Sequence, residues 1–97
     1  MTLDETMETV KNYFDAWNRH DVDALNGLFD DHVCLIDWEV TRIGRNAVLN
    51  CNRDIFQTHK NIQASVTCAH VIDNIVFCEL IVDTGKEKLK VIDKISI

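Results

Sequence analysis

The sequence contains no proline and only three glycines among its 97 residues. Proline and glycine punctuate most linkers and irregular loops, so their scarcity argues against flexible connections between separate domains. No internal repeat is visible. The chain length is typical of one domain, and we therefore expect a single domain over residues 1–97.

Basic residues are also scarce, since ten Lys and Arg stand against 16 Asp and Glu and give a formal net charge of −6. Nucleic acids and anionic membrane surfaces are bound by clustered positive charge, so neither is an expected partner. No apolar run reaches the length of about 18 residues that a membrane span needs. The first residues lack the basic flank and apolar core of a signal peptide. We expect a cytoplasmic protein.

Spacings typical of metal sites are missing. The cysteines contain no Cys-x-x-Cys pair and the histidines no His-x-x-x-His pair. His70 falls on the predicted strand face of Val66, where it could point into a cavity, but a core histidine with one hydrogen bond is the simpler interpretation. We predict no metal and no cofactor, and four cysteines that are small buried side chains without disulfides: Cys34, Cys51, Cys68 and Cys78.

The apolar pattern changes period along the chain. Before residue 60 apolar residues recur mostly every three or four positions, as in amphipathic helices, and Asp21 is a candidate N-cap. From Ile62 onward they alternate, as in strands. In chain order we predict helices over residues 3–19, about 22–30 and 45–58, and strands over residues 32–40, 62–72, 75–83 and 88–97. Helices first and strands later, with short connections, predict an α+β fold with an antiparallel sheet.

The same pattern predicts the core. Large side chains on the apolar faces of these elements should be buried: Leu3, Val10, Phe14, Trp17, Leu28, Phe56, Val66 and Leu80. The strand over residues 75–83 is apolar on nearly every position, so both of its faces should be covered. The last strand stops in mid-pattern at Ile97. We expect either a further strand missing from the domain or a second chain that covers this edge.

Three polar residues stand within or beside apolar patterns. Asp93 shares a predicted strand face with Val91 and Ile95, while lysines occupy the opposite face, so its carboxyl group should turn inward. Burial would keep that group paired, protonated with a raised pKa, or open to a cavity, whereas an edge position would leave it in water. Asp37 lies inside another apolar run. Tyr13 flanks the stripe of the first helix, where its ring can be buried and its hydroxyl can reach a polar partner.

Several segments resemble the NTF2-like (SnoaL-like) superfamily. Residues 13–21 read Tyr-Phe-Asp-Ala-Trp-Asn-Arg-His-Asp and are followed by Leu25 and by Leu-Phe-Asp-Asp at 28–31. This is similar to the opening of that superfamily. Ile-Gly-Arg-Asn-Ala-Val at 43–48 resembles the start of its third helix, and the hairpins that end at residues 91–93 resemble its sheet.

The resemblance implies a cone-shaped, cystatin-like roll in which three N-terminal helices pack on a curved antiparallel sheet and enclose an apolar pocket. It also implies a tendency to form homodimers through the sheet. Within the superfamily, ketosteroid isomerase has a catalytic Tyr on its first helix, an Asp near the end of its first strand and an Asp on a late strand. Tyr13, Asp37 and Asp93 stand at those places.

By that resemblance, Asp37 is the general base next to a carbonyl group. Tyr13 and a protonated Asp93 donate hydrogen bonds to the developing enolate oxygen. The small apolar ligand would be held by a wall of Phe14, Trp17, Trp38, Val48, Phe56, Val66 and Leu89. The implied enzyme is an isomerase, cyclase or hydratase.

Two alternatives remain open at this point. The fold also serves proteins without this chemistry, so the pocket could belong to a non-catalytic ligand-binding or dimerisation module. The chain could also be a truncated member of the superfamily that assembles through its unfinished sheet and has no enzymatic activity. The arrangement of Tyr13, Asp37 and Asp93 around one cavity would favour the enzyme.

Overall fold

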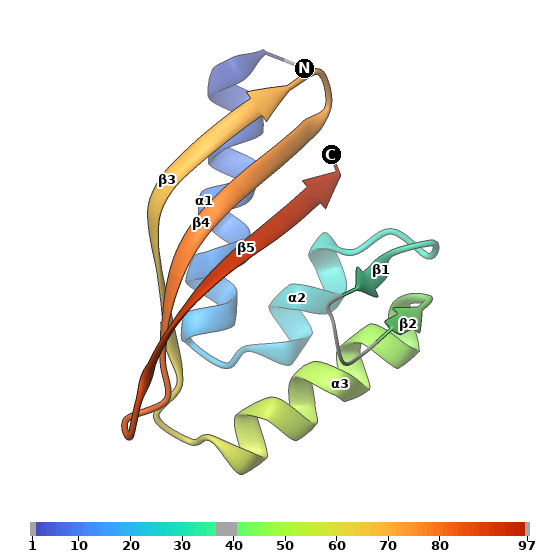
Figure 1. Ribbon diagram of the computed structural model, residues 1–97. Coiled ribbons are helices and arrows are strands. Elements are labelled where there is room, and N and C mark those ends of the chain that lie inside the picture. Colours follow the sequence, from blue (N-terminus) through green and yellow to red (C-terminus); the bar gives the residue numbers. More distant parts are fainter. Residues whose placement is uncertain (1, 37–40, 97) are drawn as a thin grey trace.

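The computed structural model describes residues 2–36 and 41–96. In chain order these form α1 (Leu3–Asn18), α2 (Val22–Leu28), β1 (Cys34–Ile36), β2 (Thr41–Ile43), α3 (Arg45–Thr58), β3 (Gln63–Ile72), β4 (Ile75–Asp83) and β5 (Lys88–Ser96). The helices lie to one side of a curved sheet of β3, β4 and β5 (Figure 1). The predicted α+β fold is confirmed. Within the described residues no helix is long and apolar enough to cross a membrane.

Local side-chain caps set where the first two helices begin. The Thr2 hydroxyl accepts a hydrogen bond from the Glu5 backbone N–H at 3.2 Å, and the Glu5 carboxylate accepts one from the Thr2 N–H at 3.3 Å. Such a capping box contributes about 1 kcal/mol to helix stability. At α2 the predicted N-cap is confirmed, because the Asp21 carboxylate accepts a hydrogen bond from the Ala24 N–H at 3.0 Å.

The described strands form two antiparallel sheets rather than one. The larger has the order β3-β4-β5, and its two connections contain Asp73 and Gly85, which adopt positive φ angles of 54° and 88°. The smaller is the pair β1–β2. β1 falls within the strand predicted over residues 32–40, of which residues 37–40 lie outside the described part of the chain, and β2 was not predicted.

A β-bulge at Thr67 decides which side chains of β3 face the helices. Val66 lies opposite Leu80 in β4, but the next paired residue is Cys68, opposite Glu79. Because strand side chains alternate, the extra residue reverses the alternation beyond this point. Cys68 and His70 therefore turn away from the helices and are exposed. The prediction that His70 is a core histidine is wrong, since the periodicity was counted through the bulge.

The described core has two neighbouring parts. In the first, Val10 and Phe14 of α1 pack on Val76, Cys78 and Leu80 of β4. In the second, side chains from all three helices meet at the start of β3: Ala16, Leu25, Leu49, Phe56 and Ile62. Thus α1 is shared by both parts and joins the other helices to the sheet.

Half of the predicted core residues are buried as expected, namely Val10, Phe14, Phe56 and Leu80. Trp17 is only partly buried. Three are exposed, with 61% of Leu3, 43% of Leu28 and 41% of Val66 accessible to solvent. Leu3 and Leu28 lie in terminal turns and Val66 lies in an edge strand beside the bulge, so each lacks packing neighbours on one side.

The cysteines also depart from the prediction. Cys78 is buried and Cys51 partly buried, whereas Cys34 and Cys68 are exposed. All four are free thiols, as expected. Cys34 belongs to the short strand β1 at the margin of the molecule, and Cys68 faces outward because of the bulge.

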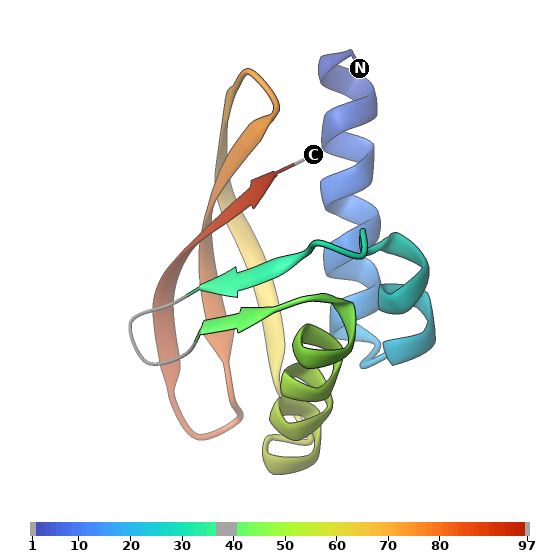
Figure 2. The same cartoon turned by 90° about the vertical axis from the view of Figure 1, so that its right-hand side faces the viewer.

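The outer face of the large sheet carries no described helix (Figure 2). We call it the outer sheet face. It contains Ile72, Ile75, Phe77, Ile81 and Ile92 by the strand register, and Ile72 and Ile92 are 59% and 69% exposed. In the single chain the outer face of β4 is not covered by a described helix, so the prediction that both faces of β4 are covered is wrong.

Candidate functional site

A pocket of about 630 Å³ lies between α1, the connection from α2 to β1, α3 and the end of β5. Its apolar wall includes Val10, Leu28, Phe29, Val48 and Ile95. Its polar residues come from different elements. They include Thr9 and Tyr13 of α1, Asn52 of α3, Asp93, Lys94 and Ser96 of β5, and Asp30 and His32 of the connection from α2 to β1. This combination of an apolar wall and a few polar groups is typical of small-molecule sites.

Tyr13 is held in the wall by aromatic contacts. Its ring lies 4.9 Å from that of Phe14 in an edge-to-face arrangement and 6.0 Å from that of Phe29. Burial raises the pKa of the Tyr13 hydroxyl far above its ordinary value, and the negative charges of Asp93 and Cys78 add to the effect. Tyr13 therefore keeps its proton and can act as a hydrogen-bond donor over a wide pH range.

Asp93 faces the helices, as the alternation of the last strand predicted. It lies opposite Cys78 in the β4–β5 ladder and between Val91 and Ile95 on the same face. It is partly buried and lines the pocket. Burial, and after it the charge of Asp93, also raises the pKa of the Cys78 thiol. The Asp93 carboxyl group thus acts electrostatically on two neighbours inside the roll.

The structure brings together two of the three predicted catalytic residues. Tyr13 and Asp93 line the same pocket, one from the first helix and one from the last strand. The third, Asp37, lies outside the described residues, as does Trp38. Leu35, which precedes Asp37 by two positions in the sequence, lines the pocket.

The predicted apolar wall is mostly replaced by other residues. Val48 does line the pocket, whereas Phe14, Trp17 and Phe56 pack within or against the core. Val66 and Leu89 are 41% and 43% exposed. Both belong to the far part of the sheet: at the strand rise of about 3.3 Å per residue, Leu89 is about 13 Å along β5 from Asp93. A side chain that faces the interior of the roll therefore does not necessarily line the pocket.

Asn52 is a pocket residue that the sequence reasoning missed. It is 4% exposed. Its side-chain oxygen accepts a hydrogen bond from the Trp17 indole N–H at 3.2 Å, and its amide donates to the Val48 carbonyl at 3.2 Å. A signal existed, because Asn52 stands four positions after Val48 and four before Phe56, within the apolar stripe of α3. A polar residue in such a stripe is a candidate for a pocket wall.

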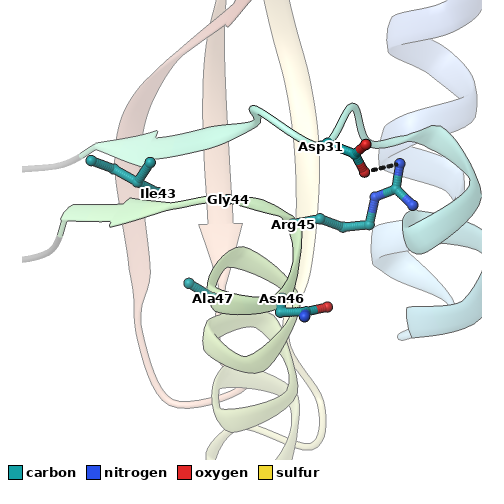
Figure 3. Close-up of a pocket in the computed structure, with 6 residues that line it drawn as sticks. All are labelled: Asp31, Ile43, Gly44, Arg45, Asn46 and Ala47. Carbon is teal, nitrogen blue, oxygen red and sulfur yellow. Dashed lines mark ion pairs between the residues drawn. The ribbon is translucent and has the colours of Figure 1, made fainter.

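A second depression of about 470 Å³ lies at the start of α3, beside Gly44 and Asn46 (Figure 3). Here Arg45 forms an ion pair with Asp31 at 3.0 Å and donates a hydrogen bond to the Phe29 carbonyl at 2.8 Å. These contacts tie the α2–β1 connection to α3. Both contacts are made by Nη2 of the guanidinium group, whereas the buried Nε atom has no hydrogen-bond partner among the described residues.

Comparison with known proteins identifies the family. Residues 10–93 match the family model of the SnoaL-like domain. The chain belongs to the SnoaL-like domain family. The match spans most of α1, the other helices and the strands up to Asp93, so it includes both described candidate residues of the pocket. No curated protein matches this SnoaL-like domain significantly.

Solved structures with low sequence identity share the fold. An uncharacterised cystatin-fold protein from Novosphingobium aromaticivorans superposes with a TM-score of 0.86 at 20% identity, over 95% of this chain and 87% of that chain. A protein from Kribbella flavida, proposed to be a ketosteroid isomerase, gives 0.80 at 20% identity, over 97% and 69%. An epoxide hydrolase from M. tuberculosis gives 0.74 at 13% identity, over 96% and 73%. The predicted NTF2-like, cystatin-like roll is confirmed.

Proposed function

We propose that this SnoaL-like domain binds a small apolar carbonyl compound and catalyses proton transfer at the carbon next to the carbonyl group. One observation carries the proposal: Tyr13 of α1 and Asp93 of β5 line the same pocket. In the reaction, Tyr13 and protonated Asp93 donate hydrogen bonds to the substrate oxygen, where negative charge develops as the enolate forms. Asp37 removes the proton and returns it to another carbon.

The pocket has a suitable size and surface for such a ligand. Its volume of about 630 Å³ falls within the range of roughly 300–1,000 Å³ that is usual for small-molecule sites. A ligand that covers the apolar wall displaces water from it, and each hydrogen bond to the enolate oxygen then stabilises it more than the same bond would in solution. Asn52, fixed by Trp17 and Val48, contributes a polar group on the α3 side of the ligand.

The structural neighbours alone do not select this reaction. They include both a protein proposed to be a ketosteroid isomerase and an epoxide hydrolase, so one fold carries different chemistries. The pair of hydrogen-bond donors favours proton transfer next to a carbonyl, because such donors stabilise an oxyanion. The proposal therefore depends on Tyr13 and Asp93 and not on the likeness of folds.

The test uses β,γ-unsaturated ketones of increasing size, whose isomerisation to conjugated ketones is followed by ultraviolet absorbance. Asp37→Asn, which removes the base, should lower kcat. Tyr13→Phe and Asp93→Ala should each lower it by about 10²- to 10³-fold, as expected for loss of one oxyanion donor. Asp54→Asn is the matched control, because Asp54 is an exposed carboxylate of α3. A phenol mimics an enol. If the protein binds a phenol but converts no ketone, the result favours a non-catalytic ligand-binding module over an enzyme.

We further propose that two copies form a homodimer through the outer sheet face. Ile72 and Ile92 leave more than half of their surface in water there, and covering such apolar surface favours association. Light scattering should give roughly twice the chain mass of 11.2 kDa. Ile92→Lys should shift the protein to monomer, whereas Ile43→Lys should not, since Ile43 is equally exposed but lies on β2. A folded monomer at all concentrations would contradict the proposal.

A further inference from the structure

Three side chains with metal-binding atoms converge on the outer sheet face. Cys68 and His70 belong to β3 and Glu79 to β4. The Cys68 Sγ atom lies 3.3 Å from His70 Nε2, and His70 Nε2 lies 3.1 Å from a carboxylate oxygen of Glu79. One potential ligand atom from each residue lies within 4.8 Å of the other two. The cluster is separate from the pocket, which lies on the other face of the sheet.

The β-bulge produces this cluster. With uninterrupted alternation Cys68 would share the inward face of Val66, and Glu79 would lack both neighbours. The extra residue, Thr67, turns Cys68 and His70 outward, and Cys68 then pairs with Glu79 across the ladder. The Thr67 hydroxyl donates a hydrogen bond to the Glu79 carbonyl at 3.1 Å, which fixes the bulge against β4. The proximity of Cys68, His70 and Glu79 therefore follows from the backbone conformation at the bulge.

The contacts do not fit a catalytic Cys-His-Glu relay. In such a relay the thiol and the carboxylate contact different ring nitrogens of the histidine, so that one orients the ring while the other exchanges a proton. Here both converge on the same atom, Nε2 of His70. Two groups that compete for one nitrogen can both be satisfied by a cation placed between all three.

We propose that Cys68, His70 and Glu79 form a binding site for one zinc-class divalent ion, with water in the fourth position. Tetrahedral zinc has bonds of about 2.3 Å to sulfur and 2.0–2.2 Å to nitrogen and oxygen, which places neighbouring ligand atoms about 3.2–3.8 Å apart. The contacts of 3.3 and 3.1 Å are close to that spacing. An ion can enter after small side-chain movements.

The donor set and its exposure select the kind of ion. A thiolate and an imidazole favour Zn²⁺ or Co²⁺ over Mg²⁺ and Ca²⁺, which prefer oxygen ligands. The His70 and Glu79 side chains are 59% and 52% exposed in the single chain, so ion and water can reach the site in the monomer. All three ligands come from one chain, which predicts one ion per monomer. The cluster shares the outer sheet face with Ile72 and Ile92, so the proposed homodimer would cover it.

The experiment titrates Co²⁺ into the chelator-treated, reduced chain, at a concentration at which light scattering shows a monomer. The expected result is one equivalent bound, with a thiolate-to-cobalt charge-transfer band that excess Zn²⁺ removes. Cys68→Ser should abolish the band, and His70→Gln and Glu79→Gln should each weaken binding at least about 10-fold, as loss of a ligand requires. Cys34→Ser is the matched control, since Cys34 is also an exposed thiol but lies on β1.

Either absence of the band in the wild type or its persistence in Cys68→Ser overturns the proposal. Circular dichroism of each variant verifies folding, which exposed substitutions should not disturb. The titration contains no ketone, so its outcome is independent of the proposed pocket chemistry.

Discussion

The Asp93 carboxyl group, near the end of the last strand, raises the pKa of the Tyr13 hydroxyl on the first helix. Burial is the larger cause, and the charge of Asp93 adds to it. The neutral Tyr13 hydroxyl is a hydrogen-bond donor, and the Asp93 carboxyl group becomes a second donor when it is protonated. This relationship leads to the first prediction.

Tyr13 should ionise only far above the ordinary tyrosine pKa of about 10. It is the one tyrosine of the chain, so the phenolate absorbance of the folded protein reports on it alone. Asp93→Asn should lower the pKa of Tyr13 while leaving it above that of free tyrosine, because burial remains. Titration of Tyr13 at its ordinary pKa in the wild type would show that the hydroxyl is solvated.

The same pKa shift makes stability depend on pH. Below about pH 10 the hydroxyl is neutral in both folded and unfolded chains, so its contribution to the folded state is fully present. Above that pH the unfolded chain ionises first, and stability should fall as the pH rises toward the raised pKa of the folded state. Urea midpoints measured across alkaline pH should show this loss in the wild type and less of it in Tyr13→Phe.

Phe14→Ala should destabilise the protein by about 3–5 kcal/mol, the range for removing a buried aromatic ring. Phe14 is 6% exposed and packs between α1 and β4. Leu3→Ala is the control on the same helix, because Leu3 is 61% exposed and its loss should cost below about 1 kcal/mol. Chemical denaturation of both variants measures the free energies of unfolding. Equal decreases would show that the face of α1 containing Phe14 does not pack on the sheet.

Asn52→Ala should cost about 1–3 kcal/mol, because it leaves the partly buried Trp17 indole N–H without its acceptor. In Trp17→Phe the donor is already gone, so the further cost of Asn52→Ala should be smaller. A double-mutant cycle by chemical denaturation measures this coupling. Additive losses would show that the hydrogen bond does not contribute to stability.

Two glycines should respond to alanine in opposite directions. Gly44 precedes α3 with a φ angle of 93°, although a Cβ atom there would meet only the Asp31 carbonyl at 3.9 Å. Backbone strain alone should therefore make Gly44→Ala destabilising by about 1–3 kcal/mol. Gly27 lies within α2 with open space around it, so Gly27→Ala should stabilise by up to about 1 kcal/mol. Thermal unfolding of the two variants should show midpoints on either side of the wild type.

Periodicity by itself determined the helices and the long strands. The third helix, over residues 45–58, and the strand over residues 75–83 have the predicted bounds. Local chemistry also placed Asp21 as an N-cap and Asp93 on the inward face. These features depend on neighbours along the chain, on the 3.6- and two-residue periods, and on turns with their own residue preferences. The family resemblance added Tyr13, Asp37 and Asp93 as candidate catalytic residues.

Only the tertiary structure decided where that pattern shifts and which inward residues reach the pocket. The bulge at Thr67 follows from pairing between β3 and β4, which no count along one strand can show, and it moved Cys68 and His70 to the outer sheet face. Phe14 and Leu89 both face inward, yet one is core and the other is exposed, since the distance to the pocket depends on how helices and strands pack. The position of the bulge and the choice of pocket-lining residues both depend on contacts between segments that are far apart in the sequence.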